Sequence, residues 1–163
     1  MQFIDVILEN VPFIMVATAI LLGAVLGLVA RSKRVMVESM IRYMMLLVVG
    51  ASSLWKVISY LLFIIDAPFF RFELTALYVG LGVAGIIGFK QNFSYWFAIA
   101  IVETFFLWGA AVGNLYLLML SQFGKNTSGS LVMIMYMNLI IPLLLNFLLY
   151  YYYRHFYRQT MAS

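Results

Sequence analysis

The sequence predicts an all-α integral membrane protein, a bundle of five transmembrane helices that residues 1–163 form as a single domain. Composition is the first reason: 66% of the residues are hydrophobic and only 10% are charged, whereas soluble domains carry about 25% charged residues. The second reason is that the apolar residues fall into five segments, each near the roughly 20 residues that a helix needs to cross a bilayer. The intervals between these segments are too short to hold a soluble domain of even about 50 residues.

The first predicted span covers residues 11–30 and ends at the basic run of residues 31–34. Pro12 falls in the expected first turn, where the missing N–H of proline costs no hydrogen bond. The residues before the span carry Asp5 and Glu9 and no Lys or Arg. They therefore lack the basic start of a cleaved signal peptide, and we expect the first helix to remain in the mature protein.

The second predicted span begins near Met36 and ends before Asp66, which makes it longer than one crossing requires. Its start is expected at the membrane interface, where Glu38 and Arg42, four residues apart, can pair on one helix face. The stretch of residues 122–130 has the composition of a loop. The other three spans are predicted at residues 69–89, 94–120 and 131–153.

The basic residues predict the orientation of the bundle, because cytoplasmic flanks carry an excess of Lys and Arg. With the N-terminus outside, the outer flanks hold only Arg71 and Lys125. The sequence therefore predicts an N-out, C-in protein, which we expect in a prokaryotic cytoplasmic membrane. The inner flanks would hold Arg31, Lys33, Arg34, Arg42, Lys90, Arg154 and Arg158.

Two ionisable side chains, Lys56 and Glu103, fall inside predicted spans. A charge at such a depth costs about 2.5 to 3.5 kcal/mol on insertion scales, so each calls for a partner or a function. Lys56 shares a helix face with Ser52 and Ser59. Glu103 shares one with Asn114, which makes these five residues the candidate intramembrane polar site. Three interpretations stay open: a structural ion pair, a proton-linked or substrate-binding site, and side chains that reach the interface or another subunit.

Several other residues have structural explanations at their positions. Glu73, a secondary candidate, enters the third span in its first turns, where a carboxylate meets the positive end of the helix dipole. Pro142 predicts a kink in the fifth span, because it leaves the carbonyl of Asn138 without a donor. Residues 150–158 alternate aromatic rings with cations and include the single histidine, His155. This composition is typical of an interfacial anchor.

Small residues recur within the spans, most densely at residues 80–88, where glycine stands at 80, 82, 85 and 88. The pairs Gly23/Gly27 and Gly109/Gly113 repeat the spacing of four. Such patterns predict close packing of membrane helices. The letters of residues 80–88 also match a dinucleotide fingerprint, but that motif works only in a turn from strand to helix.

Four segments follow one another from the third span onward, namely residues 70–73, the glycine-rich residues 80–88, residues 106–114 and residues 141–144. Their order resembles a family of small prokaryotic multi-span membrane proteins known only as a domain of unknown function. The resemblance covers a little over half of the chain. That family has no assigned activity, so the resemblance implies a fold and no chemistry.

The sequence favours a noncatalytic helical-bundle or accessory membrane subunit, in contact with the lipid bilayer and with a homo-oligomeric or membrane partner protein. The alternative is a small transporter or channel that uses Lys56, Glu103 and Asn114. An enzyme is less favoured, since the chain has no cysteine and one histidine. We expect no cofactor and no metal, since the chain lacks cysteine and has one histidine. We also expect no nucleic-acid partner, because the net charge of +4 comes from residues beside apolar spans.

Overall fold

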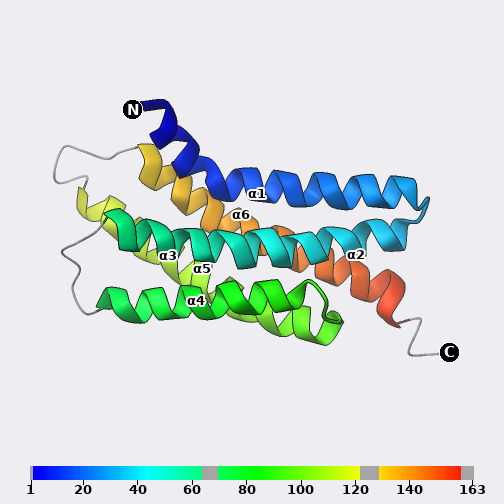
Figure 1. The fold of residues 1–163 in the computed structure, drawn as a ribbon. Helices are drawn as coiled ribbons and strands as arrows, with labels where there is room; N and C mark the ends of the chain where they lie inside the picture. The colour runs from blue at the N-terminus through cyan, green and yellow to red at the C-terminus, as the bar shows by residue number, and fades with distance from the viewer. Residues whose placement is uncertain (1, 64–69, 122–128, 159–163) are drawn as a thin grey trace.

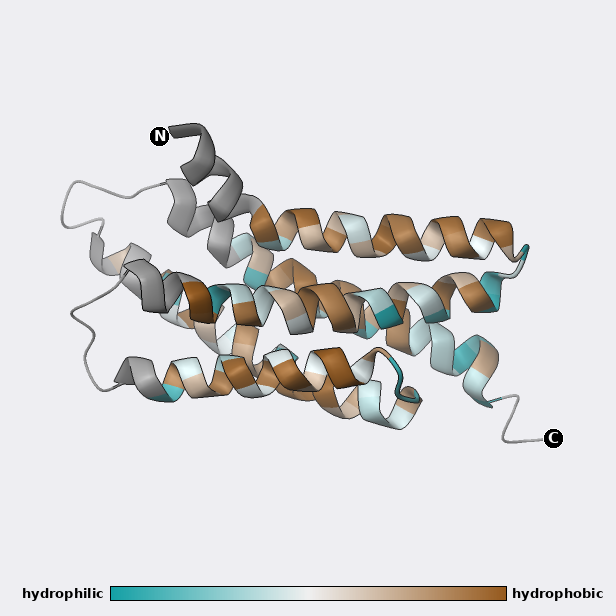
Figure 2. Cartoon of the chain, viewed as in Figure 1, coloured by the Kyte–Doolittle hydropathy of each residue, from teal (hydrophilic) through white to brown (hydrophobic). Residues whose placement is uncertain are grey.

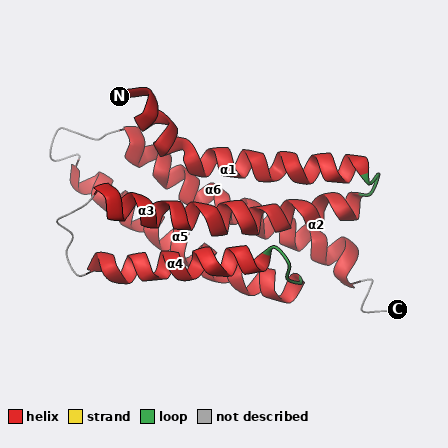
Figure 3. Ribbon diagram, viewed as in Figure 1, coloured by secondary structure: helices red, strands yellow, loops and turns green. Residues whose placement is uncertain are grey.

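A computed structural model describes residues 2–63, 70–121 and 129–158 of the chain. Within these ranges every regular element is a helix, as the sequence predicts (Figure 3). The elements are α1 (Gln2–Val29), α2 (Lys33–Tyr43), η1 (Met44–Ala51), α3 (Ser52–Phe63), α4 (Phe70–Gly88), α5 (Phe93–Ser121), α6 (Gly129–Tyr152) and η2 (Tyr153–Tyr157).

The helices lie roughly side by side as long rods (Figure 1). Because η1 follows α2 and precedes α3 without a break, residues 33–63 form one continuous rod with a π-helical middle. The α1–α2 turn, the α4–α5 turn and η2 lie at one end of the bundle, and the start of α1 lies at the other. We call the end with the two turns and η2 the basic end. It holds the residues Arg31, Lys33, Arg34, Arg42, Lys90, Arg154 and Arg158.

Three helices in the described residues are long and apolar enough to cross a membrane. Their candidate spans are Val11–Val29, Lys33–Ile58 and Phe93–Tyr116, and Glu73–Gly88 in α4 forms a shorter apolar stretch. Hydrophobic residues run along the rods, whereas hydrophilic ones concentrate near the turns (Figure 2). This distribution suits a protein that contacts lipid along its helices. The count of five spans and the orientation stay predictions.

Two helices begin earlier than predicted, although the first predicted span, residues 11–30, agrees with the candidate span Val11–Val29. Helix α1 begins at Gln2, so Pro12 lies inside it rather than in its first turn. A proline at such a position removes one backbone hydrogen bond and bends the helix, and Figure 1 draws the first part of α1 at an angle to the rest. Helix α6 begins at Gly129, inside the predicted loop. Residues 122–128, the rest of that loop, lie outside the described residues.

The turn from α1 to α2 is set by local backbone bonds. The amide of Ser32 donates to the carbonyl of Gly27 at 3.1 Å, which closes α1. This closure needs a left-handed residue just before Ser32, and Arg31 takes that conformation with φ 50° although it has a side chain. Ser32 then caps α2, because its hydroxyl accepts from the amide of Val35 at 3.4 Å.

Glycines of α4 let this helix approach the π-helical segment η1 very closely, which confirms the packing predicted for residues 80–88 at Gly82, Gly85 and Gly88 but not at Gly80, where nothing lies within 4 Å. A Cβ at Gly85 would lie 2.6 Å from the Cα of Gly50 and 2.6 Å from the carbonyl oxygen of Met45. At Gly88 it would lie 3.3 Å from the Cβ of Met45. Real Cβ atoms do not come within 3.0 Å of backbone, so Gly85 cannot be replaced without separating the two helices.

The other two glycine pairs behave differently from each other. A Cβ at Gly23 would lie 2.6 Å from the Cα of Met40, so this pair packs α1 onto α2 as predicted. Around Gly109 and Gly113 nothing lies within 4 Å of the added Cβ. Packing of that pair against another part of the same chain is therefore not observed in the described residues.

The core runs along the inner faces of α2, η1, α5 and α6. Trp96 and Ala100 of α5 are almost inaccessible, as are Met44 and Met45 of η1 and Leu145 of α6. These residues come from segments up to about 100 positions apart, which is why the core cannot be assembled from local pattern alone. The core continues to the basic end through Leu149 and Tyr152.

Candidate functional site

The predicted intramembrane carboxylate, Glu103, points into the interior of the bundle. Its side chain is 4% exposed, and its Oε2 atom has no hydrogen-bond partner. The neighbouring residues on the same face of α5, Ala100 and Leu107, are buried as well. A carboxylate oxygen without a partner in such a setting is costly, so this position differs from an ordinary core position.

Lys56 of α3 lies within electrostatic range of Glu103 but does not contact it directly. Its Nζ atom sits 4.9 Å from the centre of the Tyr78 ring of α4, an arrangement that stabilises a cation. In the described part of the chain, however, the one ion pair closer than 4.0 Å lies elsewhere, between Arg42 and Glu38.

The described members of the predicted polar site are not joined into one hydrogen-bonded group with Lys56 and Glu103. The hydroxyl of Ser52 donates to the carbonyl of Val48 within its own helix. Asn114 stands eleven residues beyond Glu103 on α5, which places it about 16 Å further along the helix axis. Glu73 is accessible in the first turn of α4. The side chain of Ser59 lies outside the described residues.

A separate polar contact joins α5 to α6. The amide of Asn146 donates to the hydroxyl of Thr104 at 2.7 Å and to the carbonyl of Pro142 at 2.8 Å. Thr104 in turn donates to the carbonyl of Ala100 at 2.6 Å. These hydrogen bonds pair the buried polar groups with one another, which is sufficient to explain the contact as a structural one.

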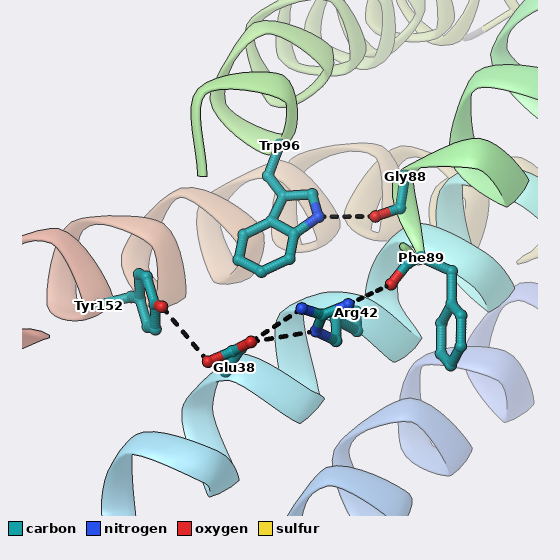
Figure 4. Close-up of polar contacts among 6 residues, drawn as sticks. All are labelled: Glu38, Arg42, Gly88, Phe89, Trp96 and Tyr152. Atoms are coloured by element: carbon teal, nitrogen blue, oxygen red, sulfur yellow. Dashed lines mark hydrogen bonds and ion pairs between the residues drawn. The ribbon is translucent and has the colours of Figure 1, made fainter. Parts of the chain in front are cut away.

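The most developed polar arrangement lies at the basic end and begins with Arg42. Its guanidinium donates from Nε and Nη2 to Oε1 of Glu38, at 3.2 and 2.9 Å, which confirms the predicted pair (Figure 4). Its Nη1 atom donates to the carbonyl of Phe89 at 2.7 Å. Arg42 therefore ties α2 to the turn between α4 and α5.

Two aromatic residues complete this arrangement (Figure 4). The indole of Trp96, only 1% exposed, donates to the carbonyl of Gly88 at 2.7 Å. The same ring lies 5.2 Å from the guanidinium carbon of Arg42. The hydroxyl of Tyr152 donates to Oε2 of Glu38 at 3.3 Å. The pair of α2 is thus held by α4, α5 and α6 together.

An open cavity of about 430 Å³ lies beside this pair. Its walls come from α2, from the α4–α5 turn, from the start of α5 and from the end of the chain's last helices. Three lining residues are cationic and one is anionic. The lining residues are Arg34, Glu38, Arg42, Lys90, Gln91, Asn92, Phe93, Trp96, Tyr152 and Tyr157.

The sequence predicts the pair of Glu38 and Arg42 but not the cavity beside it. Glu38 and Arg42 are four residues apart, and that spacing is the signal of a helical pair. Tyr152 is 114 residues from Glu38, and nothing in the sequence joins them. Residues 150–158 predict an anchor at the membrane interface, yet Tyr152 is only 6% exposed and packs inward. Within the described residues, no three His, Asp or Glu side chains come together as metal ligands would.

The model of DUF6790, a family of unknown function, matches residues 9–158. The chain belongs to this family. The match confirms the predicted resemblance to a family without an assigned activity and extends it over most of the chain. No curated protein and no solved structure matches the chain.

Proposed function

We propose that this chain is a five-span integral membrane protein, N-out and C-in, that acts without catalysis as a helical-bundle or accessory subunit of a prokaryotic cytoplasmic membrane. The observation that carries the proposal is the separation of apolar and basic residues along the bundle. Large apolar side chains such as Leu21, Phe105 and Phe147 are more than 60% exposed on the rods. Seven of the ten basic residues lie at the basic end instead.

That separation has a physical explanation. An apolar side chain that is exposed in the isolated chain contacts either lipid or a partner helix, since burial of such surface drives both insertion and association. Basic residues at one end fit the cytoplasmic side of a membrane, which carries anionic lipid and retains positive flanks. Both features support a bundle that stands across the bilayer with its basic end inside.

Reporter fusions test the topology directly. A reporter that is active only in the cytoplasm should be active when fused after Ser163 and inactive when inserted within residues 122–130. A reporter that is active only outside should give the reverse pattern. Equal behaviour at the two positions would contradict a single span between that segment and the C-terminus, and reversed behaviour would contradict the orientation.

A second candidate function, transport through the middle of the bundle, is favoured by Glu103. A buried carboxylate with an unpartnered oxygen, set within electrostatic range of Lys56, is the kind of group that binds a proton or a cation in a transporter. Proteoliposomes loaded with a pH-sensitive dye and placed in a pH gradient would reveal a proton flux. Under this proposal Glu103→Gln abolishes the flux, whereas Glu73→Gln, at an accessible position of α4, leaves it unchanged. If the dye signal is the same in proteoliposomes and in liposomes without protein, the chain does not transport protons.

A further inference from the structure

The cavity at the basic end has an excess of positive charge. Arg34, Arg42 and Lys90 line it, and Glu38 is the one carboxylate in the lining. Arg34 and Lys90 are accessible to solvent, and the side chain of Arg42 is 33% exposed. The cations come from two separate elements, α2 and the α4–α5 turn, so they approach the cavity from different sides. Such a concave basic surface attracts and concentrates anions.

Arg42 is already held in place for a ligand. A guanidinium has five N–H donors, and three of them are used by Glu38 and the carbonyl of Phe89. Two donors are left for another acceptor. Because the guanidinium is fixed by these bonds and lies against the ring of Trp96, little side-chain freedom is lost when an anion binds. The remaining donors suit the oxygens of a phosphate or carboxylate.

The start of α5 adds to the positive potential. Asn92 caps this helix, because its Oδ1 atom accepts from the amide of Tyr95 at 3.3 Å. The positive end of the helix dipole therefore faces the part of the cavity lined by Gln91 and Asn92. Both side chains carry an amide that can donate to an anion.

The size and the walls of the cavity indicate more than a single ion. About 430 Å³ falls within the range of small-molecule sites, which is roughly 300 to 1,000 Å³. Four aromatic side chains line it, contributed by Phe93 and Trp96 of α5 and by Tyr152 and Tyr157 near the end of the chain. Trp96 and Tyr152 are largely covered by their neighbours, whereas the partly exposed rings of Phe93 and Tyr157 offer apolar surface next to the cations. An anion joined to a less polar group would fill the space.

We propose that this cavity binds a phosphate-bearing anion, with Arg34, Arg42 and Lys90 around the phosphate and the aromatic wall against the group to which the phosphate is esterified. A phosphate offers several oxygens to cations that come from different directions, which a single carboxylate does less well. An anionic phospholipid and a soluble phosphate ester share this chemistry. The proposal depends on the residues that line the cavity and not on the orientation of the bundle in the membrane.

Titration of the full-length protein in a neutral detergent tests the site. The probes are dihexanoyl phosphatidylglycerol, dihexanoyl phosphatidylcholine and glycerol 3-phosphate, each at constant ionic strength set with sodium chloride. Binding is followed by tryptophan fluorescence, since Trp96 lines the cavity, and by the thermal midpoint. We expect saturable binding of at least one anionic probe and no saturation with phosphatidylcholine. A response to phosphatidylglycerol alone identifies a lipid site, and an equal response to glycerol 3-phosphate identifies a soluble ester as sufficient.

Substitutions that neutralise single cations, inside the cavity lining and outside it, test whether the anion binds in the cavity. Arg34→Gln and Lys90→Gln remove accessible cations of the lining. At about 1 kcal/mol per basic residue near an anionic group, each should weaken Kd about fivefold and the pair about 25-fold. Lys33→Gln and Arg154→Gln remove accessible cations of the same end that do not line the cavity, and they should change Kd less than about twofold. Thermal midpoints without ligand check that each variant is folded.

Two results would overturn the proposal. Equal losses in the lining and control variants would mean that the anion is attracted by the whole basic end and not by the cavity. Absence of saturable binding for both anionic probes, in folded protein, would mean that the cavity does not bind phosphate.

Discussion

The middle of the bundle and its basic end both hold a carboxylate near a cation, but they treat the charges in opposite ways. At the basic end, Glu38 and Arg42 are about one-third exposed and their groups are joined by hydrogen bonds from several helices. In the middle, Glu103 is buried with an unpartnered oxygen and Lys56 rests over an aromatic ring. The middle is instead organised by glycine contacts between α4 and η1.

This difference follows from what each region can offer a charge. Near a helix end, turns supply free carbonyls such as that of Phe89, and some water remains to solvate the groups. Within the rods, backbone groups are used by the helix itself, so a side chain must find another side chain. A charge kept under those conditions is either compensated at a distance or held for a function.

The largest effect is expected for the charges in the middle. Lys56→Met should lower the free energy of unfolding by about 3 to 5 kcal/mol, because it leaves Glu103 without a compensating charge. Glu103→Gln alone should also destabilise. The double variant should be less damaging than the sum of the two single ones, as measured by unfolding in detergent. Strictly additive effects would show that Lys56 and Glu103 do not interact energetically.

Packing between α4 and η1 is expected to be the next most sensitive feature. Gly85→Ala places a methyl group against the backbone of Gly50 and should cost about 1 to 3 kcal/mol. Gly80→Ala is the matched control on the same helix, where nothing lies within 4 Å. It should be neutral or stabilise by about 0.5 to 1 kcal/mol, since alanine is the better helix former. Thermal unfolding of the two variants in one detergent makes the comparison. A similar shift for both would contradict the tight contact.

At the basic end, Arg42→Lys keeps the charge and removes the fork that reaches Glu38 and Phe89 together. We expect a loss of about 1 to 2 kcal/mol, less than for a fully buried group because Arg42 is partly solvated. Arg154→Lys, at an accessible position of η2, should leave the unfolding midpoint unchanged. If the Arg42→Lys protein is as stable as the parent, Arg42 is kept for binding and not for holding α2 to the turn.

The smallest effect concerns a single hydroxyl. Tyr152→Phe removes the hydrogen bond to Glu38 and keeps the ring, which should cost about 1 kcal/mol. Tyr153→Phe also keeps its ring contact with Phe93, and it should have no measurable effect. Chemical denaturation of the two variants measures the difference. Equal stabilities would show that the contact between α6 and α2 depends on packing alone.

Much of the architecture was determined by the sequence itself, for reasons that act locally. A run of about 20 apolar residues favours a helix, because a helix satisfies all the backbone groups of one segment without a partner. The predicted ranges 69–89 and 94–120 accordingly agree with α4 and α5 to within one residue at each end. The spacing of Glu38 and Arg42 likewise determined their pairing. Pro12 misled the prediction of the first boundary, because a proline is compatible with both a helix start and a bent helix interior.

Only the tertiary structure decided which helix faces meet. Gly85 and Gly109 look alike in sequence, yet one lies against Gly50 and the other has nothing within 4 Å. Glu103 and Asn114 share a helix face but stand far apart along it, so one face does not make one site. Tyr152 reaches Glu38 because α6 crosses α2 at the basic end. These outcomes depend on contacts between distant segments, and the physical reason is that a helix carries its own periodicity but not the identity of the helix that packs against it.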